Sequence, residues 1–215
     1  MKKQPEIDWQ QAVRPLIKKY AGTKHPLEAK NLYQMLVMVV LSAQTTDNIV
    51  NIIAPDLFKA FPNLSSIAKT SPERLIPYIS KIRNFKNKAS WLIKIATQIK
   101  KDSAIPLTMD GLVELPGIGR KSANVIKRFA GAEIEGVMVD LHTVRVSNRL
   151  GIATSEDPKK IEEQIMNQLP KKEWDAGMSM SFLGREICRP TPLCPECLMR
   201  PACAYYNGWE VEPKP

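Results

Sequence analysis

The segment best suited to chemistry spans residues 115–140. It contains a glycine-rich turn at 116–119, followed directly by Arg120 and Lys121, and it ends at Asp140, nineteen residues after that lysine. A neutral lysine amine can attack an electrophilic carbon and form a Schiff base. A carboxylate can accept a proton or offset the positive charge that develops when a glycosidic bond breaks. The pair therefore predicts nucleophilic chemistry at a sugar carbon, with Lys121 and Asp140 as the catalytic residues.

This chemistry requires helices on both sides of the turn to hold the lysine in place. Apolar residues recur at helical spacing before and after it, which predicts a helix, a hairpin and a second helix over about 108–130. Gly117 and Gly119 are expected where the turn leaves no room for a side chain. The second helix would begin at these glycines, so its free backbone N–H groups could bind a DNA phosphate, with Pro116 and Arg120 alongside. The simpler alternative is a glycine that ends a helix, followed by a surface lysine.

Asp140 has a second interpretation, because Asp is favoured at the N-terminal cap of a helix and a helix is predicted over 141–150. The two roles are compatible. His142 is expected at the same DNA-facing surface, where it would hold the Asp140 loop by hydrogen bonding rather than act as a base or a metal ligand. Arg145 and Arg149 share one face of the predicted helix, and either solvent or DNA could lie against that face.

The composition favours an intracellular protein with a polyanionic partner. The chain has 215 residues, enough for one large or two small domains, and 44% of them are hydrophobic. Its formal net charge is +9 and is dispersed along the chain, which favours nucleic acid as the partner. No secretion signal is visible, nor an apolar run of the ~20 residues that cross a bilayer. We therefore expect an intracellular monomer that does not enter a membrane.

All four cysteines lie near the C-terminus, at Cys188, Cys194, Cys197 and Cys203, with the spacing C-x5-C-x2-C-x5-C. Stable disulfides are rare inside cells, so this cluster predicts a metal site. Four thiolates on one short loop can hold a [4Fe–4S] cluster. Zinc is the alternative, although it usually takes two closely spaced pairs. The spacing alone leaves both open.

Most of the chain is predicted to be helical. Apolar residues recur at intervals of three and four, and no segment shows the alternation typical of a strand. Ser71-Pro72 and Asp157-Pro158 are typical helix starts. A small, acidic linker at 131–137 indicates a boundary between two halves. The fold class is therefore all-α, with helices expected at 8–20, 27–43, 47–60, 72–80, 85–101, 110–115, 120–130, 141–150, 158–169 and 172–187.

Four segments together resemble the endonuclease III-type DNA glycosylases of the helix-hairpin-helix superfamily. They are LSAQTTD (41–47), LPGIGRKSAN (115–124), VDLHTVRVSNRLG (139–151) and the four-cysteine loop (188–203). They follow the family's order and span most of the chain. The resemblance implies two helical domains that flank a DNA-binding cleft. One would be a bundle over 22–133 that holds the hairpin, and the other would join 1–21 to 134–215 and hold a [4Fe–4S] cluster.

The resemblance also implies an activity, which is base-excision repair by a glycosylase that is also an abasic-site lyase. Its partner would be double-stranded DNA with a damaged base, an oxidised pyrimidine in the first instance, or with an abasic site. Lys121 matches the family's nucleophile and Asp140 its catalytic aspartate. Gln44 matches a glutamine that fills the gap left by the flipped nucleotide, although it could instead be a polar helix end capped by Thr45 and Thr46.

Two alternatives remain at this point. One is a glycosylase of the same superfamily for mismatched, deaminated or altered purine bases, and the other is a non-catalytic helix-hairpin-helix DNA-binding module. The sequence also departs from the family in two places. Arg83 and Asn84 stand where many relatives have a glycine and a bulky aliphatic residue that wedges the opposite strand, so Asn84 is expected at the DNA instead. The first cysteine spacing is one residue shorter than the family pattern.

Overall fold

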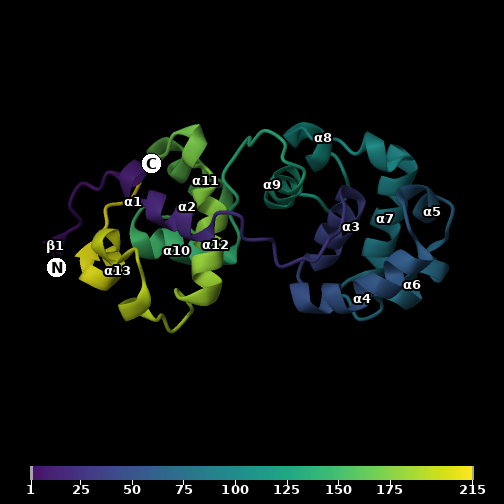
Figure 1. The fold of residues 1–215 in the computed structure, drawn as a ribbon, viewed down its shortest axis with the longest axis horizontal. Coiled ribbons are helices and arrows are strands. Elements are labelled where there is room, and N and C mark those ends of the chain that lie inside the picture. The colour runs from purple at the N-terminus through teal and green to yellow at the C-terminus, as the bar shows by residue number, and fades with distance from the viewer. Residues whose placement is uncertain (1, 215) are drawn as a thin grey trace. The chain divides into compact units, whose positions relative to one another are not determined.

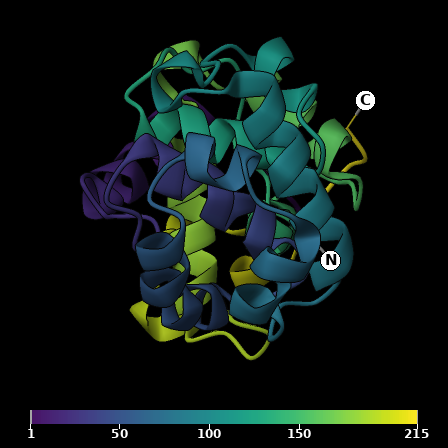
Figure 2. The same ribbon diagram turned by 90° about the vertical axis from the view of Figure 1, so that its right-hand side faces the viewer.

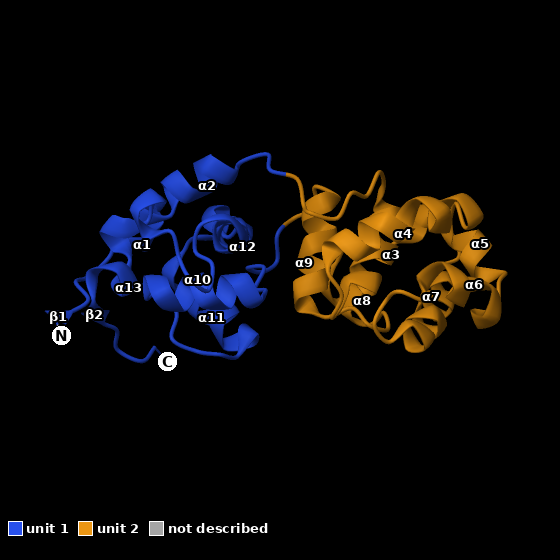
Figure 3. Cartoon of the chain, turned by 90° about the horizontal axis from the view of Figure 1, so that it is seen from below, with its two compact units in different colours: residues 1–23, 134–215 blue, residues 24–133 orange. Residues whose placement is uncertain are grey.

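The computed structural model describes residues 2–214, so Met1 and Pro215, the ends of the expected split domain, lie outside the described residues. The described chain is almost entirely helical (Figures 1 and 2), which confirms the all-α prediction. It divides into two compact units (Figure 3). Unit 1 comprises Met1–Thr23 and Ile134–Pro215, and unit 2 comprises Lys24–Glu133. The first boundary falls two residues after the one expected from the sequence.

Unit 2 is built around α3 (Leu32–Ser42), which is apolar on all sides and contacts α4, α7 and α9. The helix begins at Leu32 rather than at residue 27, because the Asn31 side chain accepts a hydrogen bond from Gln34 N (2.9 Å) and caps it there. The other elements of unit 2 are α4 (Asp47–Ala60), α5 (Leu64–Ala68), α6 (Pro72–Ile79), α7 (Phe85–Ile99), a 3-10 helix (Asp102–Ala104), α8 (Met109–Val113) and α9 (Arg120–Phe129).

Unit 1 is centred on α12 (Ala176–Glu186), which is buried over nearly its whole length and packs against α10 and α2. A side chain at Gly184 would lie 2.8 Å from His142 Cβ, so this glycine lets α10 and α12 approach closely. The other elements of unit 1 are β1 (Lys2–Lys3), α1 (Trp9–Ala12), α2 (Arg14–Tyr20), α10 (Leu141–Leu150), α11 (Pro158–Gln168), 3-10 helices at Lys171–Glu173, Cys194–Glu196 and Arg200–Ala202, α13 (Ala204–Asn207) and β2 (Trp209–Glu210).

Several predicted elements differ from the structure. The helix expected at 8–20 is two helices, because Pro15 has no N–H to continue the first one. The helix expected at 172–187 begins at Ala176, after a 3-10 turn. No segment shows strand-like alternation, and the described chain contains only one short parallel pairing, in which β1 and β2 place Lys2 opposite Trp209. Each of these strands is only two residues long, too short for an alternating pattern to show.

None of the helices in the described part of the chain is long and apolar enough to cross a membrane.

Candidate active site

The predicted hairpin lies between α8 and α9 in unit 2. Gly117 has φ +81°, a left-handed backbone that side chains disfavour, and an added Cβ would lie 2.6 Å from Cε3 of Trp91. Ile118 is buried and anchors the turn to the core of the unit. The half-buried Trp91 thus packs directly on the turn. Position 117 therefore requires glycine for two reasons, its left-handed backbone and the close contact with Trp91.

Gly119 differs from Gly117, and the expectation that both glycines lack room was wrong for it. Its φ is −101°, an ordinary value, and nothing lies within 4 Å of an added Cβ. Gly119 is the N-cap of α9, and no side chain caps this helix end. No neighbouring atom therefore fills the space beside the Gly119 Cα, directly before the first turn of α9, and a helix N-terminus is a favoured place for an anion.

Lys121 is half-buried in the first turn of α9, next to the exposed Arg120. On the preceding helix, α8, Val113 is partly exposed and Leu112 is buried, and Leu115, just after this helix, is also buried. Asn124, one turn after Lys121, is only 6% exposed, and its Nδ2 has no hydrogen-bond partner among the described residues. The lysine therefore projects from a helix that is anchored in the core of unit 2.

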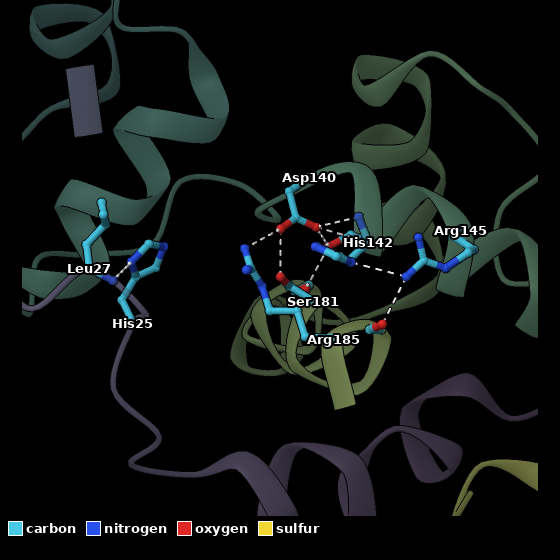
Figure 4. Close-up of polar contacts among 10 residues, drawn as sticks. His25, Leu27, Asp140, His142, Arg145, Ser181 and Arg185 are labelled. Atoms are coloured by element: carbon cyan, nitrogen blue, oxygen red, sulfur yellow. Dashed lines mark hydrogen bonds and ion pairs between the residues drawn. The ribbon is translucent and has the colours of Figure 1, made fainter. Parts of the chain in front are cut away.

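Asp140 is the N-cap of α10 in unit 1, and its side chain is only 9% exposed (Figure 4). Its Oδ1 accepts hydrogen bonds from His142 N (2.9 Å) and Thr143 N (2.8 Å), and Thr143 Oγ1 lies 3.1 Å away. Its Oδ2 accepts from Ser181 Oγ (2.7 Å) and lies 3.5 Å from Arg185 Nη2. The carboxylate is thus held by donors from two helices, in one orientation, with a cation beside it.

A chain of contacts runs from the Asp140 loop through His142 to Arg145 (Figure 4). His142 Nδ1 lies 3.1 Å from Arg145 Nη2. Because a guanidinium only donates, this nitrogen of His142 is the acceptor in that contact. Arg145 also donates to the carbonyls of Cys188 (2.9 Å) and Gly184 (2.9 Å). The Arg145 side chain therefore points inward and binds main-chain oxygens, so its orientation requires neither solvent nor DNA.

Arg149 folds over the cysteine loop in the same way. It donates to the carbonyls of Arg189 (2.6 Å) and Pro190 (2.9 Å), lies 3.5 Å from Cys188 Sγ, and stacks 4.8 Å from the ring centroid of Tyr205. The expectation of a solvated or DNA-facing side chain was incomplete here as well. The loop after α12 is rich in proline and does not form an α-helix, so its carbonyls take their hydrogen bonds from arginines of α10.

The four cysteines are unpaired thiols that line one pocket in unit 1. The pocket also has apolar walls from α10 and α12, so the four sulfur donors share one space with apolar side chains. Four sulfur donors with apolar surroundings fit a thiolate-ligated metal group. The cysteines are Cys188, Cys194, Cys197 and Cys203, and the walls are formed by Val146, Leu150, Leu183 and Ile187.

Gln44 and Asn84 lie in two loops of unit 2, and both are exposed with φ 56°. This left-handed conformation is uncommon for residues other than glycine. Thr45 Oγ1 accepts a hydrogen bond from Arg83 N (3.2 Å), which ties the two loops together. Thr46 caps the following helix, α4, as the alternative expected, whereas the Thr45 side chain accepts from the other loop.

Sequence reasoning missed four residues that lie beside candidate residues, two in unit 1 (Ser181 and Arg185) and two in unit 2 (Asn124 and Lys88). The first two contact Asp140 from a helix some forty residues away, and no local pattern marks that contact. Asn124 and Lys88 are polar residues at buried helical positions. Their only sequence signal is a polar residue within an apolar stripe.

Comparison with known proteins places this chain in a class. Residues 37–171 match the model of the HhH-GPD superfamily base excision DNA repair proteins. The chain is 34% identical to Endonuclease III of Synechocystis over 87% of its own length and 88% of that protein. It is 35% identical to Endonuclease III of Bacillus subtilis over 80% of its own length and 81% of that protein. The chain belongs to the HhH-GPD superfamily of base excision DNA repair proteins.

Within that superfamily the similarity is to endonuclease III. The structure matches that of a trapped endonuclease III–DNA covalent intermediate with a TM-score of 0.83 and 31% identity, over 95% of this chain and 99% of the other. A non-covalent endonuclease III–DNA complex matches equally well, with a TM-score of 0.83. A thermostable thymine-DNA glycosylase, at 21% identity, shares the fold. The resemblance to endonuclease III-type glycosylases is thereby confirmed.

Proposed function

We propose that this protein is a base-excision repair glycosylase with abasic-site lyase activity that acts on oxidised pyrimidines in double-stranded DNA. The observation that carries the proposal is Lys121, placed in the first turn of α9 directly after the hairpin, in a chain that matches over 95% of its length a protein captured in covalent linkage to DNA. The relatives are endonuclease III proteins, so neither a purine-directed enzyme nor a non-catalytic binding module is favoured.

DNA binding comes first and depends on charge and on the hairpin. The uncapped N-terminus of α9 and the exposed Arg120 present donors to a backbone phosphate, and Pro116, Gly117 and Gly119 shape that approach. The net charge of +9 adds a general attraction for DNA. The damaged nucleotide must leave the base stack before a protein atom can reach its C1′ carbon. We assign Gln44 to the gap that it leaves and Asn84 to the DNA surface beside it.

Lys121 then supplies the nucleophile. Its neutral amine forms a bond from Nζ to C1′ while the glycosidic bond breaks, and the base departs with the bond's electron pair and takes up a proton. Loss of a proton from Nζ and opening of the sugar ring at O4′ give a Schiff base. Removal of a C2′ proton then expels the 3′ phosphate and nicks the strand. Hydrolysis of the remaining imine returns the free lysine.

Asp140 supplies the fixed negative charge. Its carboxylate is held by His142 N, Thr143 N and Ser181 Oγ, so it needs little reorganisation when positive charge develops on the sugar. His142 contributes through its backbone N–H and through its contact with Arg145, and we place it at the edge of the DNA-facing surface.

We assign a [4Fe–4S] cluster to the four cysteines rather than zinc. The shared pocket and the four-sulfur donor set fit such a cluster, and the resemblance to endonuclease III-type glycosylases favours it over zinc. When bound, the cluster would cross-link the proline-rich loop to the end of α12. The protein itself also orders this loop, because Arg145 and Arg149 donate hydrogen bonds to its carbonyls around the pocket. Reconstituted protein would be brown with visible absorbance, whereas a zinc protein would be colourless.

Borohydride trapping tests the proposed activity. Wild type should form a covalent complex with duplexes that carry an abasic site or an oxidised pyrimidine, and Lys121→Gln should form none while it binds DNA within a few-fold of wild type. Arg120→Gln is the matched control, since it should weaken binding yet still be trapped at saturating DNA. Absence of a trapped complex with wild type on every duplex, with binding intact, would overturn the Schiff-base assignment.

A further inference from the structure

Two loops of unit 2 carry residues with a left-handed backbone at the surface assigned to DNA. They are Gln44, between α3 and α4, and Asn84, just before α7. Asn adopts this conformation readily, whereas Gln does so only where the surrounding structure enforces it, so the strain lies at Gln44. The hydrogen bond from Arg83 N to Thr45 Oγ1 joins the loops but does not by itself fix the peptide before Gln44.

The Lys88 side chain contacts the backbone beside Gln44. It lies in the first turn of α7 and is only 2% exposed. Its Nζ donates to the carbonyls of Leu41 (2.8 Å) and Ala43 (2.5 Å), and its backbone N–H donates to the Asn84 carbonyl (3.1 Å). The Ala43 carbonyl belongs to the peptide that leads into Gln44, so its hydrogen bond fixes the orientation of that peptide plane.

The position also suits a cation. The last carbonyls of α3 have no partner within the helix, and the negative end of the helix dipole points at them. Burial lowers the pKa of Lys88 from 10.5 to about 8, a value that would also suit a nucleophilic lysine. A nucleophile must reach its substrate, however, and this amine is enclosed and bonded to two carbonyls. Its role is therefore in positioning and not in covalent chemistry.

We infer that Lys88 is a positioning residue that holds the Gln44 loop in the left-handed conformation from which Gln44 enters the gap left by an extruded nucleotide. This inference rests on the proposed function. If Lys88 has this role, activity on damaged duplex DNA requires it, because a gap opens in the base stack there. Activity on an abasic site in a single strand does not require it, because there is no stacked gap to fill.

The test compares Lys88→Met with Lys127→Met. Lys127 is the matched control because it is also 2% exposed and also donates to a main-chain carbonyl, that of Leu107 (2.6 Å), in a different loop. Two rates are measured for each protein under single-turnover conditions. They are base release from a duplex with an oxidised pyrimidine and borohydride trapping on a single-stranded abasic oligonucleotide.

Lys88→Met should lower the duplex rate about tenfold or more and leave single-strand trapping within about twofold of wild type. Lys127→Met should keep the wild-type ratio of the two rates, even if it lowers stability. Combining Lys88→Met with Gln44→Ala should cost no more on duplex DNA than Gln44→Ala alone, because both changes remove the same step. An equal loss on both substrates, or losses that multiply in the double variant, would overturn the inference.

Lys88→Gln keeps the test decisive if Lys88→Met fails to fold. Its shorter amide can still donate to one of the two carbonyls, so it should give a smaller loss, again confined to the duplex substrate. A loss equal on both substrates would count against the inference. If wild type itself shows neither base release nor trapping, the result would contradict the proposed function rather than the role of Lys88.

Discussion

Replacing Gly117 by alanine tests whether the hairpin is held by its contact with Trp91. Alanine at φ +81° costs about 1–2 kcal/mol. The added Cβ would lie 2.6 Å from Cε3 of Trp91, and relieving such an overlap costs about 1–3 kcal/mol. Together these predict that Gly117→Ala lowers the free energy of unfolding by about 2–5 kcal/mol. Urea unfolding followed by circular dichroism measures this change.

Gly119→Ala is the matched control two residues along. Nothing lies within 4 Å of the added Cβ, and φ is ordinary. Loss of a favourable N-cap destabilises the fold by up to about 1 kcal/mol. Alanine also lowers the conformational entropy of the unfolded chain, which stabilises the fold by about 0.4–1 kcal/mol. The free energy of unfolding should therefore change by less than about 1 kcal/mol. The methyl group would instead occupy the space by which a phosphate approaches α9, so DNA affinity should fall. Equal destabilisation by the two alanines would refute the assignment of different roles to the two glycines.

Three further outcomes are expected. The folded-state pKa of Lys88, about 8, lies below its unfolded value of 10.5, so wild type should gain stability over Lys88→Met as pH rises from about 8 to 10.5, by at most about 3 kcal/mol. This gain in stability should be lost again as pH falls through about 8. Urea unfolding of both proteins across this range measures it, and a stability difference that does not change with pH would contradict the prediction. Asp140→Asn keeps a good N-cap but removes the charge, so base release should slow about 100- to 1,000-fold with little change in stability or DNA affinity. A loss of affinity as large as the loss of rate would contradict this. Cys197→Ser should lose visible absorbance and lower the unfolding temperature of unit 1, because ligand bonds hold that loop; an unchanged thermal transition would argue against a structural metal group.

The all-α fold and the order of helices were predictable because apolar periodicity is a local property. The helix at 47–60 and the helix starts at Pro72 and Pro158 agree with the structure. The sequence failed where a single capping or proline residue decides the boundary, as at Asn31 and Pro15. It also missed α5, whose five residues are too few to show a period.

The sequence by itself determined the chemistry-bearing residues, because their signals are close in the chain. Lys121 follows its hairpin immediately, Asp140 begins the helix that it caps, and the four cysteines occupy one short loop. Only the tertiary structure decided what holds these residues in place. Ser181 and Arg185 contact Asp140, and Lys88 fixes the carbonyl before Gln44, across separations of about forty residues or more. Such contacts follow from how helices pack, and a side chain's burial and hydrogen-bond partners exist only once those helices have met.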